Sequence, residues 1–445
     1  MYLKRFFVEG LAHASYLFGS DGEAAVVDPK RDVDDYLADA EREGFRIIAI
    51  LNSHPHADFA SGFRELAERT GAKVYVSHLA PAKYEHIAAQ DGDRIKIGSL
   101  DLELLATPGH SPDSLSFLVR EKEQPIALFT GDLLFVNDVG RPDLRDADED
   151  PSGLAGKMYD SLFQKVMTLP DEVKVYPSHG AGSLCGRAIS DAPFSLVGQE
   201  RKLNWALQLT DRDQFVREMT ANLPDRPAYF SYDVDLNLRG APPLSSLPQL
   251  KEMSESDLAD AKKSGATVID TRPPAAFGAG HFPGSINIGM GSPSFSTWTG
   301  FMVPGDKPIV LILNSPNDAK KAQLDLARIG FDNILGYVHA ETVTKPEKLP
   351  QISVEEIKGQ LTNGPLLIDV RTPTEWRHGH IEKAKHVPLA SFAHQLPDLP
   401  KDRSIRVICG SGYRSSIATS LLQAAGYQDV ANVTGGMTAY SEAAS

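Results

Sequence analysis

Ser53-His54-Pro55-His56-Ala57-Asp58-Phe59 directly follows the apolar run Ile47-Ile48-Ala49-Ile50-Leu51. A short apolar run of this kind is typical of a buried strand. Loops at strand ends are where α/β proteins usually carry functional side chains, because a rigid scaffold positions them there. This loop contains an H-x-H-x-D pattern, whose two imidazoles and carboxylate can converge on one ion. The segment therefore predicts a metal site at the end of a strand in an α/β domain.

Three more potential ligands follow in chain order. His110 lies in Pro108-Gly109-His110-Ser111, Asp132 in Thr130-Gly131-Asp132, and His179 in Pro177-Ser178-His179-Gly180. Each comes after an apparent strand or a tight glycine turn. A single histidine is more often a core or surface residue than a ligand, whereas the joint pattern favours a metal centre.

This set of motifs resembles the metallo-β-lactamase superfamily over residues 1–240. The resemblance implies an αββα sandwich, in which two sheets lie between layers of helices. Binuclear hydrolases of the superfamily, such as glyoxalase II, carry H-x-H-x-D-H, and the final histidine helps to hold a second metal. Here Phe59 stands at that position, and its side chain supplies no lone pair. We therefore expect the second metal site to be impaired.

Within the superfamily the chain resembles the persulfide dioxygenases. That resemblance implies one Fe(II) per chain, bound by His54, His110 and Asp132. Two imidazoles and one carboxylate leave open positions on the iron, where a sulfur ligand and O2 can both bind. The same resemblance gives His56, Asp58 and His179 one of two roles: they orient the iron ligands from outside, or they are the remnant of the second metal site.

Two residues near these motifs are candidates for substrate binding. Arg141, in Gly140-Arg141-Pro142-Asp143, belongs to a segment that resembles the dioxygenases. Its guanidinium suits the carboxylate of a thiol carrier such as glutathione, and it equally suits a structural pair with Asp143. Cys185 follows the His179 loop closely. It either touches substrate or carries a persulfide, or it is a buried thiol that packs as a small apolar residue.

The rest of the chain contains an internal repeat. Linker signals at 240–246 and 345–350 separate two segments, which we place at 247–345 and 352–445. Val268-Ile269-Asp270-Thr271-Arg272 with Gly280-His281 recurs as Leu367-Ile368-Asp369-Val370-Arg371 with Gly379-His380. The repeated order of strands and helices predicts two copies of one α/β module.

The second copy contains a reactive-cysteine motif. Ile408 ends an apolar strand, and Cys409-Gly410-Ser411-Gly412-Tyr413-Arg414-Ser415-Ser416 opens a helix. Backbone N–H groups at a helix N-terminus stabilise an anionic sulfur. The segment resembles the active loop of rhodaneses, which implies that Cys409 is the persulfide-forming nucleophile. Its loop would consist of Gly410, Ser411, Gly412, Tyr413 and Ser415.

Loop length distinguishes this motif from a cysteine-based phosphatase. Four residues separate Cys409 from Arg414, whereas those phosphatases have five between cysteine and arginine. The shorter loop suits a sulfane sulfur better than a phosphate. We expect Arg414 either to stabilise the anion or to brace the loop.

The first copy has lost this motif. Aligning Ala322 with Ala418 puts Leu313 opposite Cys409 and Asp318 opposite Arg414. Leucine cannot form a persulfide, so we interpret 247–345 as a degenerate rhodanese-like domain that serves as a spacer or docking surface. Its Asp270, Arg272 and His281 are then expected to support the fold.

Composition limits the classes of function. The 445 residues carry a formal charge of −14, and 42% are hydrophobic. This length suggests several domains, and the negative charge argues against nucleic-acid or anionic-membrane partners. The two cysteines lie in different predicted domains, which argues against a disulfide framework. The N-terminus lacks the apolar segment of a signal peptide, so we expect a cytoplasmic protein, and we also expect a homo-oligomer.

The leading hypothesis is therefore a non-haem Fe(II) persulfide dioxygenase joined to a sulfurtransferase. It would oxidise a low-molecular-weight persulfide, for instance of glutathione or coenzyme A, with O2 to sulfite and thiol. Cys409 would then transfer sulfane sulfur to sulfite and give thiosulfate, with fusion raising the effective concentration of the intermediate. Two alternatives stay open: a glyoxalase II-like thioester hydrolase with a rhodanese, and a non-oxidative sulfur carrier.

Overall fold

The computed structural model describes residues 1–145, 150–221, 223–360 and 364–442. The chain divides into two compact units, the first formed by Met1–Leu247 with Ala327–Gly330 and the second by Pro248–Leu326 with Phe331–Ser445. Each unit has its own sheets and its own cores, as expected for a chain too long for a single hydrophobic core. Among the described helices, none combines the length and the apolarity that crossing a membrane requires.

The first unit contains two six-stranded sheets. The first sheet has the order β1-β2-β3-β4-β5-β6, with β1 Tyr2–Val8, β2 His13–Ser20, β3 Glu23–Val27, β4 Arg46–Leu51, β5 Lys73–Ser77 and β6 Ile87–Ala89. The second has the order β14-β13-β10-β9-β8-β7, with β7 Arg94–Ile97, β8 Leu100–Ala106, β9 Leu115–Glu121, β10 Gln124–Gly131, β13 Lys174–Pro177 and β14 Ser195–Leu196. A short hairpin, β11 Leu134–Phe135 and β12 Asp138–Val139, follows β10.

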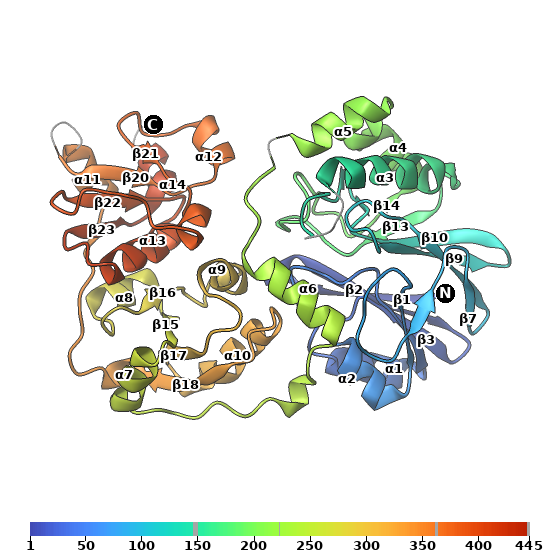
Figure 1. Cartoon of the computed structure of the whole chain (residues 1–445), viewed down its shortest axis with the longest axis horizontal. Coiled ribbons are helices and arrows are strands. Elements are labelled where there is room, and N and C mark those ends of the chain that lie inside the picture. The colour runs from blue at the N-terminus through green and yellow to red at the C-terminus, as the bar shows by residue number, and fades with distance from the viewer. Residues whose placement is uncertain (146–149, 222, 361–363, 443–445) are drawn as a thin grey trace. The chain divides into compact units, whose positions relative to one another are not determined.

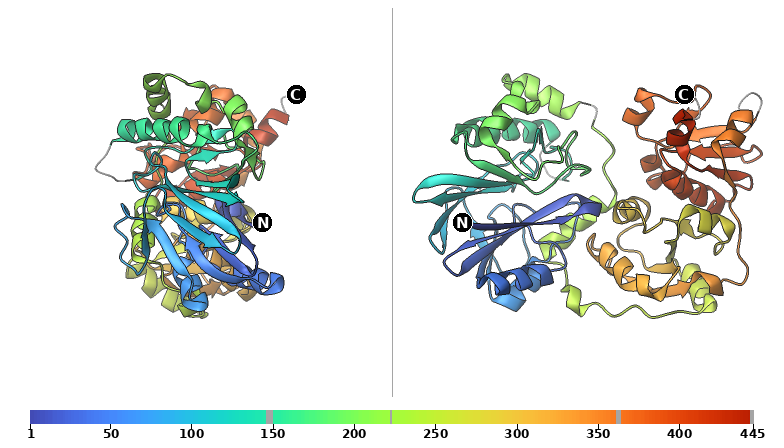
Figure 2. Two further views of the ribbon diagram at one scale, coloured as in Figure 1. Left: turned by 90° about the vertical axis from the view of Figure 1, so that its right-hand side faces the viewer. Right: turned by 180° about the vertical axis from the view of Figure 1, so that it is seen from behind.

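Helices cover the outer face of each sheet, as Figure 1 shows and the views in Figure 2 repeat. They are α1 Asp34–Glu43, α2 Phe63–Thr70, α3 Pro151–Gln164, α4 Val197–Leu203 and α5 Arg212–Thr220. The sixth helix, α6 Tyr229–Arg239, packs beside the loop that follows β4. Tyr36 of α1 and Phe63 of α2 pack on the first sheet, whereas Met158 of α3 and Phe215 of α5 pack on the second. The predicted αββα sandwich is confirmed.

The core between the two sheets is aromatic and aliphatic. Phe18 and Leu51 from the first sheet meet Leu104, Phe117 and Phe129 from the second, and all of these side chains are buried. Burial on both faces explains why strands such as β4 and β10 are continuous apolar runs and do not alternate.

The second unit contains two parallel sheets. The middle copy has the order β16-β15-β17-β18, with β15 Thr267–Asp270, β16 Ile286–Asn287, β17 Ile309–Leu313 and β18 Ile334–His339. The C-terminal copy has β19-β23-β22-β20-β21, with β19 Gln351–Ile352, β20 Leu366–Asp369, β21 Lys385–His386, β22 Ile405–Ile408 and β23 Val430–Val433. Apart from the additional β19, the two orders correspond strand by strand, which confirms the repeat.

The helices of the second unit follow the same repeat. The middle copy has α7 Glu255–Lys263, α8 Pro274–Ala279, α9 Phe295–Met302 and α10 Ala319–Ala327, and the C-terminal copy has α11 Val354–Gln360, α12 Pro373–His378, α13 Tyr413–Ala424 and α14 Gly436–Glu442. Short 3₁₀ turns complete the chain at Glu9–Leu11, Val166–Thr168, Ala206–Gln208, Leu244–Ser246, Pro316–Asp318, Ala340–Thr342 and Leu389–Ala393. In both copies one helix begins directly after the central strand, α10 after β17 and α13 after β22.

Candidate metal centre and sulfur site

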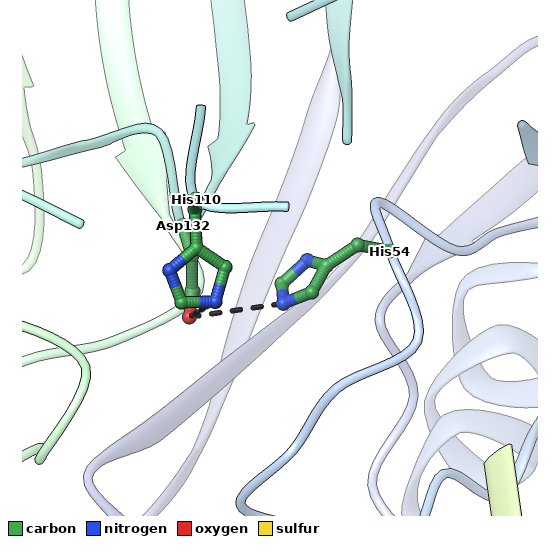
Figure 3. A group of neighbouring side chains, drawn as sticks. All are labelled: His54, His110 and Asp132. Atoms are coloured by element: carbon green, nitrogen blue, oxygen red, sulfur yellow. Dashed lines mark ion pairs between the residues drawn. The ribbon is translucent and has the colours of Figure 1, made fainter. Parts of the chain in front are cut away.

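The three predicted iron ligands lie together in the first unit. His54 follows β4, His110 follows β8 and Asp132 follows β10, so both sheets contribute. The distance from Asp132 Oδ2 is 3.4 Å to His110 Nε2 and 3.8 Å to His54 Nε2. Figure 3 shows both imidazoles turned toward the carboxylate. Residues far apart in sequence thus meet at the strand ends, where the pattern predicted them.

These three side chains have the chemistry of a metal site. Each offers a donor atom, and the three atoms lie within 4.8 Å of one another. His54 Nε2 and Asp132 Oδ2 are buried without a hydrogen-bond partner among the described residues, which is costly unless an ion binds them. Burial lowers the pKa of His54 and of His110, which favours the neutral, ligating imidazole. The donor set fits a divalent transition-metal ion.

Two glycines allow this close approach. A Cβ atom on Gly140 would lie 1.9 Å from the carbonyl oxygen of Asp132 and 3.1 Å from His110 Nδ1. Gly131 has a φ of +52°, and a Cβ there would lie 2.7 Å from the side chain of Ser53. Any larger residue at either position would push the ligand loops apart.

His179 bridges two carboxylates beside the three ligands. Its Nδ1 lies 2.8 Å from Asp132 Oδ1 and its Nε2 lies 2.7 Å from Asp58 Oδ2. Burial acts to lower the pKa of His179, but Asp132 and Asp58 together raise it well above the usual value. A protonated His179 would hold Asp132 in place and would have no lone pair to give a metal.

Phe59 occupies the space beside these residues. Its ring stacks on His13 at a centroid distance of 3.7 Å and contacts His56 at 4.3 Å. Phe59 is buried, and the two ring nitrogens of His13 have no hydrogen-bond partner among the described residues. Where the binuclear enzymes carry a ligand, this chain therefore has an apolar ring.

Three residues that the sequence reasoning missed surround the metal loop. Asp28, at the end of β3, accepts a hydrogen bond from Ser53 N and pairs with His56 Nε2 at 3.1 Å. Asn237 of α6 donates to the carbonyls of His56 and Phe59 and accepts from Ser61 N, so one side-chain amide holds three points of the loop. The third of these residues is His13, whose ring stacks on Phe59. The strand-end position was a signal for Asp28, whereas Asn237 is separated from the loop by most of the first unit.

Arg141 and Cys185 lie on adjoining segments. Arg141 N donates to the carbonyl of Cys185, which ties the two segments together. The Arg141 guanidinium is buried, and it contacts Asp143 at 2.7 and 3.0 Å and the Pro224 carbonyl at 2.7 Å. These contacts match the structural alternative for Arg141, and a substrate contact stays a prediction.

Cys185 is buried close to the His179 pair. Its Sγ and one donor atom each of Asp58 and His179 lie within 4.8 Å of one another. Burial raises the pKa of the Cys185 thiol, and the negative charges of Asp58 and Asp132 raise it further. Among the described residues this is a second group with metal-ligand chemistry, but the Asp58–His179 ion pair already engages two of its members.

The predicted sulfur site of the second unit lies between a strand and a helix. Cys409 follows β22 and α13 begins four residues later. Gly412 N lies 3.1 Å and Ser415 Oγ 3.3 Å from Cys409 Sγ, and both donate to it. Gly412 has a φ of +100°, which turns its N–H toward the sulfur. The loop therefore presents donors to an anionic sulfur, and it reaches solvent at Ser411, which is exposed.

Arg414 forms an ion pair within the same copy. Its two terminal nitrogens lie 2.6 and 2.7 Å from the carboxylate oxygens of Glu375, at the start of α12. Burial acts to raise the pKa of Glu375, but the Arg414 guanidinium lowers it to about 2. A bidentate pair of this kind fixes the orientation of the loop.

In the middle copy Leu313 ends β17 and is fully buried. The loop after it uses its own backbone donors: Asn317 N donates to Ser315 Oγ and Asp318 N to the Ser315 carbonyl. Pro316 stands where the C-terminal copy has Gly412, and proline has no N–H to donate. The middle loop therefore lacks both the nucleophile and one of its donors.

Comparison with known proteins covers both units. Residues 8–179 match the metallo-β-lactamase superfamily, and residues 247–339 and 353–443 match the rhodanese-like domain. The mitochondrial persulfide dioxygenase of Bos taurus is 32% identical over 231 residues, covering 51% of this chain and 83% of that protein. A hydroxyacylglutathione hydrolase of Polaromonas sp. is 35% identical over 161 residues, covering 36% of this chain and 57% of that protein.

A solved structure extends the comparison. A metallo-β-lactamase of Staphylococcus aureus subsp. aureus superposes with a TM-score of 0.68 at 31% identity, covering 78% of this chain and 99% of that one.

Proposed function

Because the chain belongs to the persulfide dioxygenases of the metallo-β-lactamase superfamily and carries two rhodanese-like domains, we propose that it oxidises a small persulfide and then transfers sulfur. In the first reaction a persulfide, O2 and water give the thiol and sulfite with two protons. The S–S bond breaks, the outer sulfur is oxidised and O2 is reduced. Glutathione and coenzyme A persulfides are the proposed substrates.

The observation that carries this proposal is the contrast between His54, His110 and Asp132 and the Phe59 position. The three donors are buried and close together, whereas Phe59 fills the neighbouring space with a ring that binds no metal. A single ion with open positions suits O2 chemistry, and a pair of ions suits a hydrolase. We therefore propose one Fe(II) per chain, which would supply the activation of O2 beside the persulfide sulfur.

The surrounding residues would keep this centre in order. We assign His179, paired with Asp132 and Asp58, to holding the Asp132 carboxylate, and Asp28 to orienting His56. Burial of the ligands excludes water, which limits loss of a reactive sulfur species. Cys185 would line the substrate side, and Arg141 would shape that side through its hydrogen bond to the Cys185 carbonyl or by binding the thiol carrier.

The second reaction would take place at Cys409. Its thiolate attacks the sulfane sulfur of a donor, a new S–S bond forms, and the donor thiol leaves with the electron pair. Sulfite then attacks the outer sulfur, takes it as thiosulfate and regenerates the Cys409 thiolate. Gly412 N and Ser415 Oγ would stabilise the anionic sulfur in both steps, while Glu375 keeps Arg414 in position. A cytoplasmic location and a homo-oligomer stay predictions.

Oxygen uptake by the purified full chain tests the first reaction. With glutathione persulfide or coenzyme A persulfide, we expect stoichiometric O2 consumption, sulfite as product and one iron per chain by metal analysis. His110→Ala should abolish O2 uptake, and Cys409→Ser should keep O2 uptake while thiosulfate formation is lost. Two zinc ions per chain without O2 uptake, together with hydrolysis of a glutathione thioester, would establish the hydrolase alternative instead.

Phe59→His sharpens the same test. The substitution returns an imidazole to the position beside His13 and His56, so metal analysis should find more than one ion per chain. Phe59→Leu is the matched control, because it also removes the ring but adds no ligand. An unchanged metal content in Phe59→His would count against the assignment of this position.

A further inference from the structure

The helix that carries the persulfide loop has a hydroxyl face toward the middle copy. Ser416 Oγ of α13 donates to Asn287 Oδ1 at 2.6 Å, and Asn287 N donates to Ser420 Oγ at 3.0 Å. At the start of the helix, the Tyr413 hydroxyl donates to the Gly289 carbonyl at 3.1 Å. These three residues lie on one side of α13, because positions three, four and seven apart share a face.

Asn287 is held rigidly from its own side. Its Nδ2 donates to the carbonyls of Asp270 and Arg272, at 3.1 and 2.8 Å, at the end of β15. Asn287, Ser416 and Ser420 are all buried. A buried amide with every partner satisfied fixes its neighbours more strictly than apolar packing does. The middle copy therefore fixes the rotation of α13.

The Ser416–Asn287 hydrogen bond is close in sequence to the residue that contacts the sulfur. Ser416 binds Asn287, and its neighbour Ser415 donates to Cys409 Sγ at 3.3 Å. Gly289 lies under the Tyr413 ring, where an added Cβ would be 3.5 Å from a ring carbon. A small rotation of α13 would move Ser415 Oγ and the Gly412 N–H together relative to Cys409 Sγ.

We propose that the middle copy acts as a positioning module for the persulfide loop, with Asn287 as its central positioning residue. The inference rests on the proposed sulfur transfer by Cys409. It gives the degenerate copy a role in catalysis without a nucleophile of its own. It also gives a reason for a buried polar side chain, Asn287, at the end of β16 in a copy whose loop lacks a cysteine.

Single-turnover loading of the full chain with thiosulfate tests the proposal. The Cys409 thiolate takes the outer sulfur, the S–S bond of thiosulfate breaks, and sulfite leaves with the electron pair. Mass spectrometry of the Cys409 peptide follows the persulfide. For Asn287→Ala we expect the loading rate constant to fall on the order of tenfold, because misplaced donors stabilise the transition state poorly, while the final extent of loading equals that of the unsubstituted chain.

The extent of loading separates positioning from folding. A substitution that only unfolds part of the sample lowers the extent and leaves the rate constant of the remainder unchanged, and that result would overturn the proposal. Ser416→Ala tests the same contact from α13 if Asn287→Ala does not fold. The double variant should be no slower than Asn287→Ala alone, because Asn287→Ala already removes the acceptor of the Ser416 hydroxyl.

Thr419→Val is the matched control. Thr419 is buried on the same helix, but its hydroxyl donates only to the carbonyls of Ser415 and Ser416 in the bonds that the structure describes. We expect its loading rate to equal that of the unsubstituted chain. Loading rates of Asn287→Ala and Ser416→Ala that both equal the rate of the unsubstituted chain would refute the positioning role. Absence of any persulfide on Cys409 in the unsubstituted chain would instead refute the proposed function.

Discussion

The two rhodanese-like copies share a supporting framework and differ in their loops. In the middle copy the Arg272 guanidinium binds Asp270 at 2.6 Å and the Gly280 carbonyl at 2.8 Å. In the C-terminal copy Arg371 binds Asp369 and the Gly379 carbonyl, both at 2.7 Å. The ring stack is kept as well: His281 stacks on Phe277 at 3.8 Å, and His380 stacks on Trp376 at 3.7 Å.

The two copies differ most in the loop that follows the central strand. Leu313 replaces Cys409, Pro316 replaces Gly412 and Asp318 replaces Arg414. These changes remove the proposed nucleophile, a sulfur-directed N–H and a cation, yet the central sheet and its polar framework persist. Fold and reactivity are therefore carried by separate residues, and either can be changed alone.

The largest expected effect comes from exchanging the nucleophile. Cys409→Ser should abolish sulfur transfer, and adding Leu313→Cys should not restore it. The introduced thiol would lack the N–H that Pro316 cannot supply, and its carboxylate neighbour Asp318 would oppose an anionic sulfur. Persulfide analysis by mass spectrometry checks both variants. A persulfide on the introduced thiol of the double variant would show that the middle loop can support a persulfide in spite of Pro316 and Asp318.

A smaller effect is expected from the shared framework. Asp369→Ala leaves Arg371 buried without its ion partner, which should lower the free energy of unfolding by about 3–5 kcal/mol. Asp270→Ala should have a similar effect through Arg272, because the two pairs have nearly the same geometry. Denaturant unfolding of both variants measures this. A large loss in one copy and none in the other would mean that the frameworks are not equivalent.

The Glu375–Arg414 pair should give the C-terminal copy a pH dependence of stability that the middle copy lacks. Its counterpart is absent by sequence, since Ala276 and Asp318 occupy these positions. The pKa of Glu375 falls from 4.5 to about 2 on folding, so the pair stabilises the chain above pH 4.5 and the contribution disappears as the pH falls through about 2. The difference in stability between the unsubstituted chain and Glu375→Gln should follow this course. We expect it to be small, because the Glu375 side chain is 36% exposed.

The smallest expected effect is a change of ring. Trp376→Phe makes the C-terminal stack resemble the middle one, and His380 keeps a partner. We expect the free energy of unfolding to change by less than about 1.5 kcal/mol, with sulfur transfer retained. Thermal unfolding and a thiosulfate assay measure the two quantities. Loss of transfer in this variant would mean that the ring contacts the substrate.

Local patterns in the sequence predicted much of this architecture. His54, His110, Asp132 and Cys409 could be found because each follows a strand, and side chains at strand ends are positioned by the rigid sheets. The repeat of Asp-x-Arg and Gly-His elements predicted the two α/β copies of the second unit. The degenerate loop was visible as Leu313 opposite Cys409.

Contacts over long sequence distances were not predictable in this way. Asn237 is 181 residues from His56, whose carbonyl it binds, and a polar residue on an amphipathic helix gives no hint of its partner. Asn287 likewise meets Ser416 across two copies of the repeat. For Arg141 the sequence offered two equal alternatives; the structure adds its contacts with Asp143 and Pro224, and substrate binding stays a prediction.

The Asn237 contact also sets a rule for cutting the chain. A shortened version that stops before Tyr229 would keep every proposed ligand and nearly all of the two sheets, but it would release the His56 and Phe59 carbonyls and the Ser61 N–H from α6. We expect the metal loop of such a fragment to be held less firmly. A version that extends to Arg239 keeps these three contacts, whereas the hydrogen bond from Ala60 N to the Arg328 carbonyl also needs residues Ala327–Gly330, which belong to the same unit.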